Sequence, residues 1–139
     1  MATNETLTAP ASTRGRALTI TLWVLQILLA VFFLVGAAVP KLTGDPTQVE
    51  MFDHLGGQWF RYVVGTLEAA GAIGLLIPRL AGLAALGLFG VMVGATFASV
   101  FVLGAGVLFA LPAALGVVAF LVAWGRWPQT KALLASLRR

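Results

Sequence analysis

Long apolar stretches dominate the chain and set the positions of the expected helices. Charged residues are almost absent from 18–40, 62–78 and 80–125. A helix needs about 20 residues to cross about 30 Å of hydrocarbon, so the last stretch is long enough for two passes. The pattern predicts an all-α fold, an integral membrane four-helix bundle. Its helices are expected near 17–39, 58–77, 80–103 and 106–125.

Polar segments at both ends bound the expected membrane domain, 17–128. Residues 1–16 are rich in Thr, Ala, Ser and Pro without periodicity, which is typical of a disordered cytoplasmic tail. Residues 129–139 alternate basic residues with leucine and are expected to form a basic cytoplasmic tail on the inner leaflet. Pro40 and Pro128 are expected to end the first and last helices, because proline interrupts the backbone hydrogen bonds of a helix.

The loop 40–57 is the largest segment expected outside the membrane between two helices. Its Thr47 and Glu50 have the spacing of a capping box, in which each side chain accepts from the backbone N–H of the other residue. Three apolar side chains then share one helical face: Val49, Phe52 and Leu55. The spacing predicts a short amphipathic helix over 48–55, on the outer membrane surface or over the mouth of the bundle.

Composition and charge agree with a membrane protein. The chain is 60% apolar and 10% charged, with a mean hydropathy of +0.98, well outside the globular norm. Its net charge of +4 does not suggest nucleic acid, because the basic residues are scattered beside the apolar stretches. Lys41 and Arg61 lie on one side of a four-pass arrangement, and seven basic residues lie on the other: Arg14, Arg16, Arg79, Arg126, Lys131, Arg138 and Arg139. This bias predicts that both termini are cytoplasmic.

Several kinds of chemistry are excluded by the residue types. The chain has no cysteine, which excludes thiol relays, disulfides and thiolate metal sites within it. A lone His54 beside Glu50 and Asp53 is a poor ligand set, so no metal site is expected. There is no nucleotide loop, nucleophile motif or heme-type histidine pair, and no catalytic residue is identified. The chain is therefore not expected to be an enzyme by itself, and electron chemistry would need a bound cofactor or a partner.

Glu68 is the most informative residue, because it lies at the middle of an apolar stretch. A charged carboxylate near the bilayer centre costs at least about 2.5 kcal/mol, so such a residue usually faces a cavity or a partner. Gln26 is expected within about 5 Å of the same depth, and Arg61 lies on the same helix face as Glu68. The candidates for ligand binding or proton transfer are Glu68, Gln26, Lys41, Arg61, Thr96 and Ser99.

Two interpretations of Glu68 remain open at this point. It is either part of a site with its mouth near Lys41 and Arg61, or a protonated polar pin that bonds Gln26 or a backbone carbonyl and holds two helices together. Interhelical polar contacts contribute only about 0.6 kcal/mol on average, which favours a function. Gly90 and Gly94 form a GxxxG pattern, which permits close approach of helices within one monomer or in a homo-oligomer.

At these residues the chain resembles the DoxX-like family of small four-helix bacterial membrane proteins. The resemblance covers about 22–126 and is carried by Leu34-Val35-Gly36-Ala37-Ala38-Val39-Pro40-Lys41-Leu42, by 49–56, by 65–80 and by Gly94-Ala95. It implies a four-helix bundle in the bacterial inner membrane and a link to quinone or membrane redox chemistry, known from a thiosulfate:quinone oxidoreductase subunit. Lys41 and Glu68 match positions typical of the family. Ser99 stands where members often have a histidine, which argues against a histidine-dependent redox role.

The leading functional prediction is an accessory or redox-associated subunit that binds a small apolar ligand, a quinone or a lipid, around Glu68. No covalent cofactor is expected, and a redox role would need a partner protein with flavin or metal. The alternative is a proton-coupled small-molecule exporter that uses Glu68. Small four-helix multidrug transporters carry their glutamate in the first helix, which places this alternative second. A membrane assembly factor is the third prediction.

Overall fold

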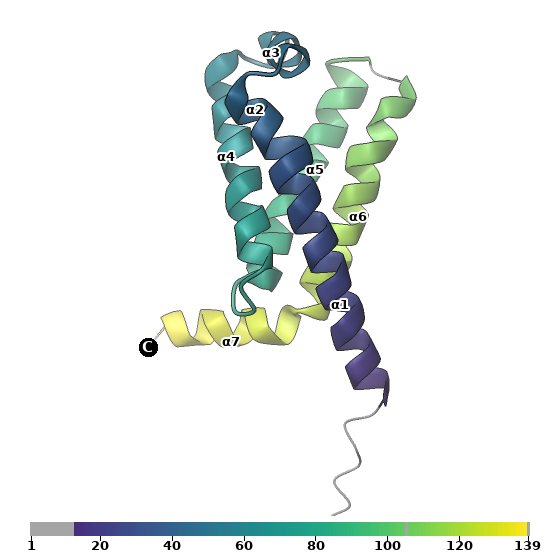
Figure 1. The fold of residues 1–139 in the computed structure, drawn as a ribbon, viewed down its shortest axis with the longest axis vertical. Coiled ribbons are helices and arrows are strands. Elements are labelled where there is room, and N and C mark those ends of the chain that lie inside the picture. The colour runs from purple at the N-terminus through teal and green to yellow at the C-terminus, as the bar shows by residue number, and fades with distance from the viewer. Residues whose placement is uncertain (1–12, 105, 139) are drawn as a thin grey trace, which may run out of the picture.

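The computed structural model describes residues 13–104 and 106–138, and this part of the chain contains helices without any strand (Figure 1). The expected all-α fold is therefore confirmed. The predicted disordered tail lies mostly outside the described residues, and its last residues, from Thr13, already belong to a helix. The elements in chain order are α1 (Thr13–Val31), the π-helix η1 (Phe32–Ala38), α2 (Val39–Thr43), α3 (Pro46–Asp53), α4 (Gln58–Leu75), α5 (Ala81–Phe101), the 3-10 helix η2 (Gly106–Phe109), α6 (Ala110–Gly125) and α7 (Trp127–Leu137).

The first helix is longer than predicted. In Figure 1, α1, η1 and α2 form one continuous rod, so the boundary predicted at Pro40 is wrong. Pro40 lies in the first turn of α2, directly after the π-helical turns, where the altered hydrogen-bond spacing accommodates a residue without an N–H donor. The rod ends instead at Gly44, whose φ of 82° is the left-handed conformation typical of glycine after a helix.

The short helix α3 follows and covers one end of the molecule (Figure 1). The predicted amphipathic helix is present, but it begins at Pro46 and its cap is Asp45 rather than Thr47. The Asp45 carboxylate accepts hydrogen bonds from the backbone N–H groups of Thr47 and Gln48, at 3.0 and 3.4 Å. Asp45 is the better cap here because Pro46 then occupies the first helical position, where no N–H is needed. Phe52 is buried beneath the helix.

The long helices α1, α4, α5 and α6 lie side by side and enclose the core (Figure 1). The rod, α4, α5 and α6 each contribute one of the largest fully buried apolar side chains: Phe33, Leu75, Leu88 and Val122. Small residues let α4 and α5 approach closely. A Cβ on Gly74 would lie 2.8 Å from the Cβ of Ala84, closer than real Cβ contacts allow.

The last helix, α7, turns away from α6 by 65° and crosses the end opposite α3 (Figure 1). Pro128 was predicted to end a helix, but it lies in the first turn of α7, and the basic segment predicted as a tail is helical to Leu137. Thr130 is buried against α5 at Gly82, which has no side chain to block it. The α7 end of the molecule therefore has a defined structure.

The helices differ in whether they are long and apolar enough to cross a membrane. Among the described residues, two helices are long and apolar enough to cross a membrane, Gly15–Thr43 and Ala81–Phe101. A third is added if the bent pair α6 and α7 counts as one span. Many large apolar side chains on the outside of these helices are exposed, including Leu28 at 62% and Phe97 at 61%. Apolar surface of this extent is typical of contact with lipid or protein.

Candidate functional site

A cavity of about 700 Å³ lies among the helices beneath α3. Residues of η1, α2, α3, α4, α5 and α6 contribute to its wall. The wall is mostly apolar or glycine, and its polar side chains are Lys41, Gln48, Glu68 and Ser99. Pockets of this size and composition hold small organic ligands in other proteins.

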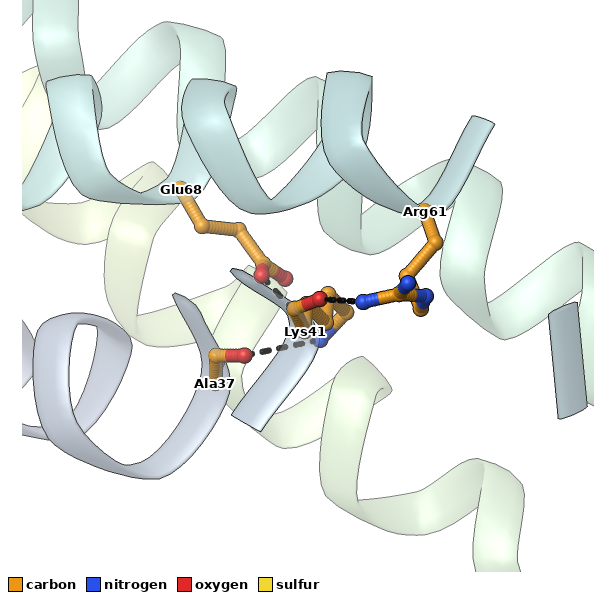
Figure 2. Close-up of polar contacts among 4 residues, drawn as sticks. All are labelled: Ala37, Lys41, Arg61 and Glu68. Atoms are coloured by element: carbon orange, nitrogen blue, oxygen red, sulfur yellow. Dashed lines mark hydrogen bonds and ion pairs between the residues drawn. The ribbon is translucent and has the colours of Figure 1, made fainter. Parts of the chain in front are cut away.

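Lys41 and Glu68 form a buried ion pair on this wall (Figure 2). Lys41 Nζ lies 3.1 Å from Glu68 Oε2, with the two side chains only 11% and 3% exposed. Lys41 Nζ also donates to the carbonyl oxygen of Ala37 at 3.3 Å. Gly65 makes this pairing sterically feasible, because a Cβ there would lie 3.0 Å from that of Lys41. The extension of the rod past Pro40 thus brings the lysine against α4.

Arg61 lies beside the pair but does not contact Glu68 (Figure 2). Its Nη1 donates to the backbone carbonyl of Lys41, in the last turn of α2, where carbonyls lack partners within the helix. Its Nε donates to Gln58 Oε1 at 2.6 Å, and its guanidinium carbon lies 4.3 Å from the ring centre of Tyr62. Arg61 is 4% exposed. It therefore fixes the backbone that carries Lys41.

Gln58 is a contributor that the sequence analysis missed. Its Nε2 donates to the carbonyl oxygen of Val49 at 2.9 Å and to Asp53 Oδ1 at 2.6 Å. These bonds connect α3 to the first turn of α4 and, through Arg61, to the ion pair. The only sequence signal was a polar residue directly after Gly56 and Gly57, at the start of an apolar helix.

Gln26 bonds other partners, so the interpretation of Glu68 as a pin that bonds Gln26 is wrong. Its Nε2 donates to the carbonyl oxygen of Leu75 at 2.7 Å, and its Oε1 accepts from Arg126 Nε at 2.7 Å. Gln26 therefore joins α1 to the end of α4 and to the start of α7. A buried polar contact between helices therefore exists, but Gln26 makes it and Glu68 takes no part in it.

Arg126 was not predicted to be buried, because it was counted only among the basic residues on one side of the membrane. It is only 6% exposed, and its guanidinium carbon lies 5.4 Å from the ring centre of Trp23. Of its donors, Nη2 is buried without a hydrogen-bond partner. Nothing in its sequence surroundings distinguishes a buried arginine from an exposed one.

Thr96 and Ser99 both bond to their own helix but face different spaces. The Thr96 hydroxyl donates to the carbonyl oxygen of Met92 at 2.7 Å, and the Ser99 hydroxyl to that of Ala95 at 2.8 Å. Ser99 lines the main cavity, whereas Thr96 lines a separate apolar hollow of about 410 Å³ between α5 and α6. The structure thus brings Lys41, Glu68 and Ser99 to one cavity, with Arg61 behind Lys41, and leaves Thr96 and Gln26 outside it.

Gly90 and Gly94 also line the main cavity. A Cβ at either position would meet no atom within 4 Å, so these glycines do not serve close helix packing inside this chain. They enlarge the cavity instead. The homo-oligomer through Gly90 and Gly94 stays a prediction.

Comparison with known proteins agrees with the resemblance of the sequence. A family model described as the DoxX-like family matches residues 24–122, most of the chain. The chain belongs to the DoxX-like family. The matched residues include Lys41, Glu68 and every other residue that lines the cavity. No match was found among curated proteins or among solved structures. Family membership and the apolar helices together identify a small membrane protein.

The site of this DoxX-like protein combines hydrogen-bonding groups with an apolar enclosure. Lys41 supplies a donor and Glu68 supplies an acceptor. The Ser99 hydroxyl donates its hydrogen to the carbonyl oxygen of Ala95, so its own oxygen can still accept a hydrogen bond. Within the described residues, no group of three or more His, Cys, Asp and Glu side chains is placed to hold a metal ion. The arrangement is suited to orienting the polar group of a mainly apolar molecule.

Proposed function

We propose that this protein is a multi-pass membrane protein whose cavity binds a small apolar ligand, a quinone or a lipid, at the Lys41–Glu68 pair. The observation that carries the proposal is the cavity of about 700 Å³ with one ion pair in an otherwise mainly apolar wall. Ligand sites commonly have this form, a large apolar enclosure with a few polar groups that fix orientation.

The four-pass arrangement is part of this proposal, and it depends on α4. This helix carries Arg61 and Glu68, which lower its apolar character, but both side chains are buried inside the protein. Its exposed side chains that do not line the cavity are large and mainly apolar, including Trp59, Tyr62 and Ile73, which are 68%, 50% and 54% exposed. A helix with polar groups inward and apolar groups outward suits a lipid environment. We therefore count α4 as a pass beside α1, α5 and α6.

The buried ion pair itself supports a binding role. Replacing such a pair by apolar residues is often neutral or stabilising, so stability alone is a weak reason to retain it. In an apolar cavity, the Lys41 ammonium is a suitable donor for a carbonyl oxygen, as in a quinone or an ester. The contact with Lys41 holds Glu68 in place, which favours a binding site over a mobile proton carrier and keeps the exporter second.

An accessory role follows from the residue types on the cavity wall. They offer binding and orientation, and any electron transfer to a bound quinone would come from a partner protein with its own cofactor. Both termini are proposed to lie in the cytoplasm of a bacterial cell, from the distribution of basic residues along the sequence.

Binding in lipid nanodiscs tests the proposal. Native mass spectrometry of the purified protein should detect a retained apolar molecule, and added short-chain ubiquinone or monoacylglycerol should compete with it. Lys41→Met should weaken binding by about tenfold, because a charge-assisted hydrogen bond is lost. Thr96→Val, in the separate hollow, is the matched control and should bind like the wild type. A protein that retains nothing and binds neither compound would contradict the proposal.

A further inference from the structure

The first turn of α7 fixes the position of this helix against the bundle. Thr130 is buried, and its hydroxyl donates to the carbonyl oxygen of Arg126 at 3.2 Å. A Cβ on Gly82 of α5 would overlap this hydroxyl, so α7 packs there only because the residue is glycine. Arg126 in turn donates to Gln26 of α1. Because of these contacts, α7 keeps its bend of 65° from α6 and lies across the end of the molecule (Figure 1).

The face of α7 that packs on the bundle is mainly apolar. Trp127, Leu133, Leu134 and Leu137 lie three, four or seven positions from Thr130 and therefore share its face of the helix. Leu134 and Leu137 are nevertheless 43% and 72% exposed. In Figure 1 the C-terminal half of α7 extends past the bundle, so the bundle does not cover this part of the face. In a membrane, an apolar face in this position is directed toward lipid.

Among the described residues, the exposed charges at this end are all positive. Lys131 and Arg138 are exposed on α7, seven residues apart and so on the same side of its apolar face. Arg79 is exposed on the link between α4 and α5, three residues before Gly82, where α7 packs. The acidic side chains of the described residues lie elsewhere, near α3 or in the cavity: Asp45, Glu50, Asp53 and Glu68. The α7 end therefore combines a basic surface with uncovered apolar side chains.

We propose that α7 is an interfacial helix that binds the headgroups of anionic phospholipids through Lys131, Arg138 and Arg79. Long basic side chains beside an apolar face reach the phosphates while the face itself enters the acyl region. Lys131 Nζ lies 5.8 Å from the ring centre of Trp127, and tryptophan is enriched at the boundary between membrane and water. An acidic protein would match the charges but not the exposed leucines, whereas a bilayer offers phosphate and hydrocarbon side by side.

A single spin label can report the depth of α7, because the sequence has no cysteine. The full-length variants Leu137→Cys and Ala132→Cys place the label at exposed positions on opposite faces of α7. Both are measured in nanodiscs of phosphatidylcholine and phosphatidylglycerol. Oxygen, which concentrates in hydrocarbon, should relax the label on Leu137→Cys more strongly than a water-soluble nickel chelate does, and the label on Ala132→Cys should show the reverse. Stronger relaxation by nickel at both positions would place α7 in water and overturn the proposal.

Native mass spectrometry of protein released from nanodiscs with equal amounts of the two lipids reports the headgroup preference. The wild type should retain more phosphatidylglycerol, and Lys131→Gln and Arg79→Gln should each reduce that preference by about fivefold. Lys131→Arg keeps the charge and should keep the preference, as should Glu50→Gln in α3 at the other end. Equal retention of both lipids by the wild type, or the same loss in Glu50→Gln, would overturn the proposal. Neither experiment involves the cavity, so this proposal and the proposed function fail separately.

Discussion

The side chains of Gln26 and Arg126, 100 residues apart in the sequence, meet at 2.7 Å in the interior of the protein. The same glutamine holds the last turn of α4 through the carbonyl oxygen of Leu75. Arg126 directly precedes α7, whereas Lys41 and Glu68 pair on the wall of the cavity beneath α3. The buried polar contacts therefore form two groups, and substitutions in the two groups are expected to have different effects.

Gln26→Leu should destabilise the protein without affecting ligand binding. The change leaves the carbonyl of Leu75 and the guanidinium of Arg126 without partners, which costs about 2 kcal/mol. The midpoint of unfolding in increasing dodecyl sulfate should fall, whereas Gln129→Leu, at an exposed position of α7, should leave it unchanged. Gln26 does not line the cavity, so loss of binding by a folded Gln26→Leu protein would contradict the division into two groups.

The Lys41–Glu68 pair should show strong coupling in a double-mutant cycle. Lys41→Met alone should cost about 3 kcal/mol of unfolding free energy, because it leaves a buried carboxylate without its counter-charge. Lys41→Met combined with Glu68→Gln should cost less than Lys41→Met alone, because no unpaired charge remains. Unfolding of the four proteins under one set of conditions gives the coupling. Additive effects of the two changes would mean that the pair does not form in the folded protein.

The sequence predicted the helices well, since apolar stretches and glycine or proline punctuation determine their limits to within a few residues. It predicted that Glu68 faces a cavity or a partner, but it did not predict that the partner is Lys41. Pro40 was interpreted as the end of a helix. With that end, Lys41 would lie in a loop and not on a helix packed against α4. The π-helical turns that carry the chain past Pro40 have no recognisable signal in Phe32–Ala38, and the sequence alone could not reveal them.

Partners within the interior were the least predictable part of the site. Gln26 was placed at the depth of Glu68 by counting residues along a helix, but depth does not say which neighbouring helix a side chain faces. Arg126 was counted only among the basic residues on one side of the membrane, and Arg61 was placed at the mouth of the site. Both are buried because backbone or amide oxygens from other helices lie within their reach, and such contacts depend on tertiary packing.

The proposed topology has a direct test in bacterial cells. Alkaline phosphatase is active only outside the cytoplasm, so a fusion after Arg139 should be inactive and an insertion between Gly44 and Thr47 should be active. The excess of basic residues beside one set of helix ends is the reason for this expectation. A reporter that is active at the cytoplasmic end, or at neither position, would rule out four passes with both termini inside.

Two glycines in similar helices should respond in opposite ways to alanine. Gly74→Ala should lower the midpoint of unfolding by the equivalent of about 1–3 kcal/mol, because the new methyl group would lie 2.8 Å from the Cβ of Ala84 and force α4 from α5. Gly90→Ala should cost nothing, because its methyl group enters the cavity without meeting an atom within 4 Å.

The larger change Gly90→Leu should fill part of the cavity and weaken ligand binding while the protein remains folded. The same variants test the homo-oligomer predicted through Gly90 and Gly94. If these glycines pack against a second copy, Gly90→Ala should shift the mass in gentle detergent from oligomer to monomer, as measured by native mass spectrometry. If the glycines only enlarge the cavity, the mass should not change and only Gly90→Leu should impair binding. Loss of the oligomer in Gly90→Ala would therefore show that the glycines form a contact between copies.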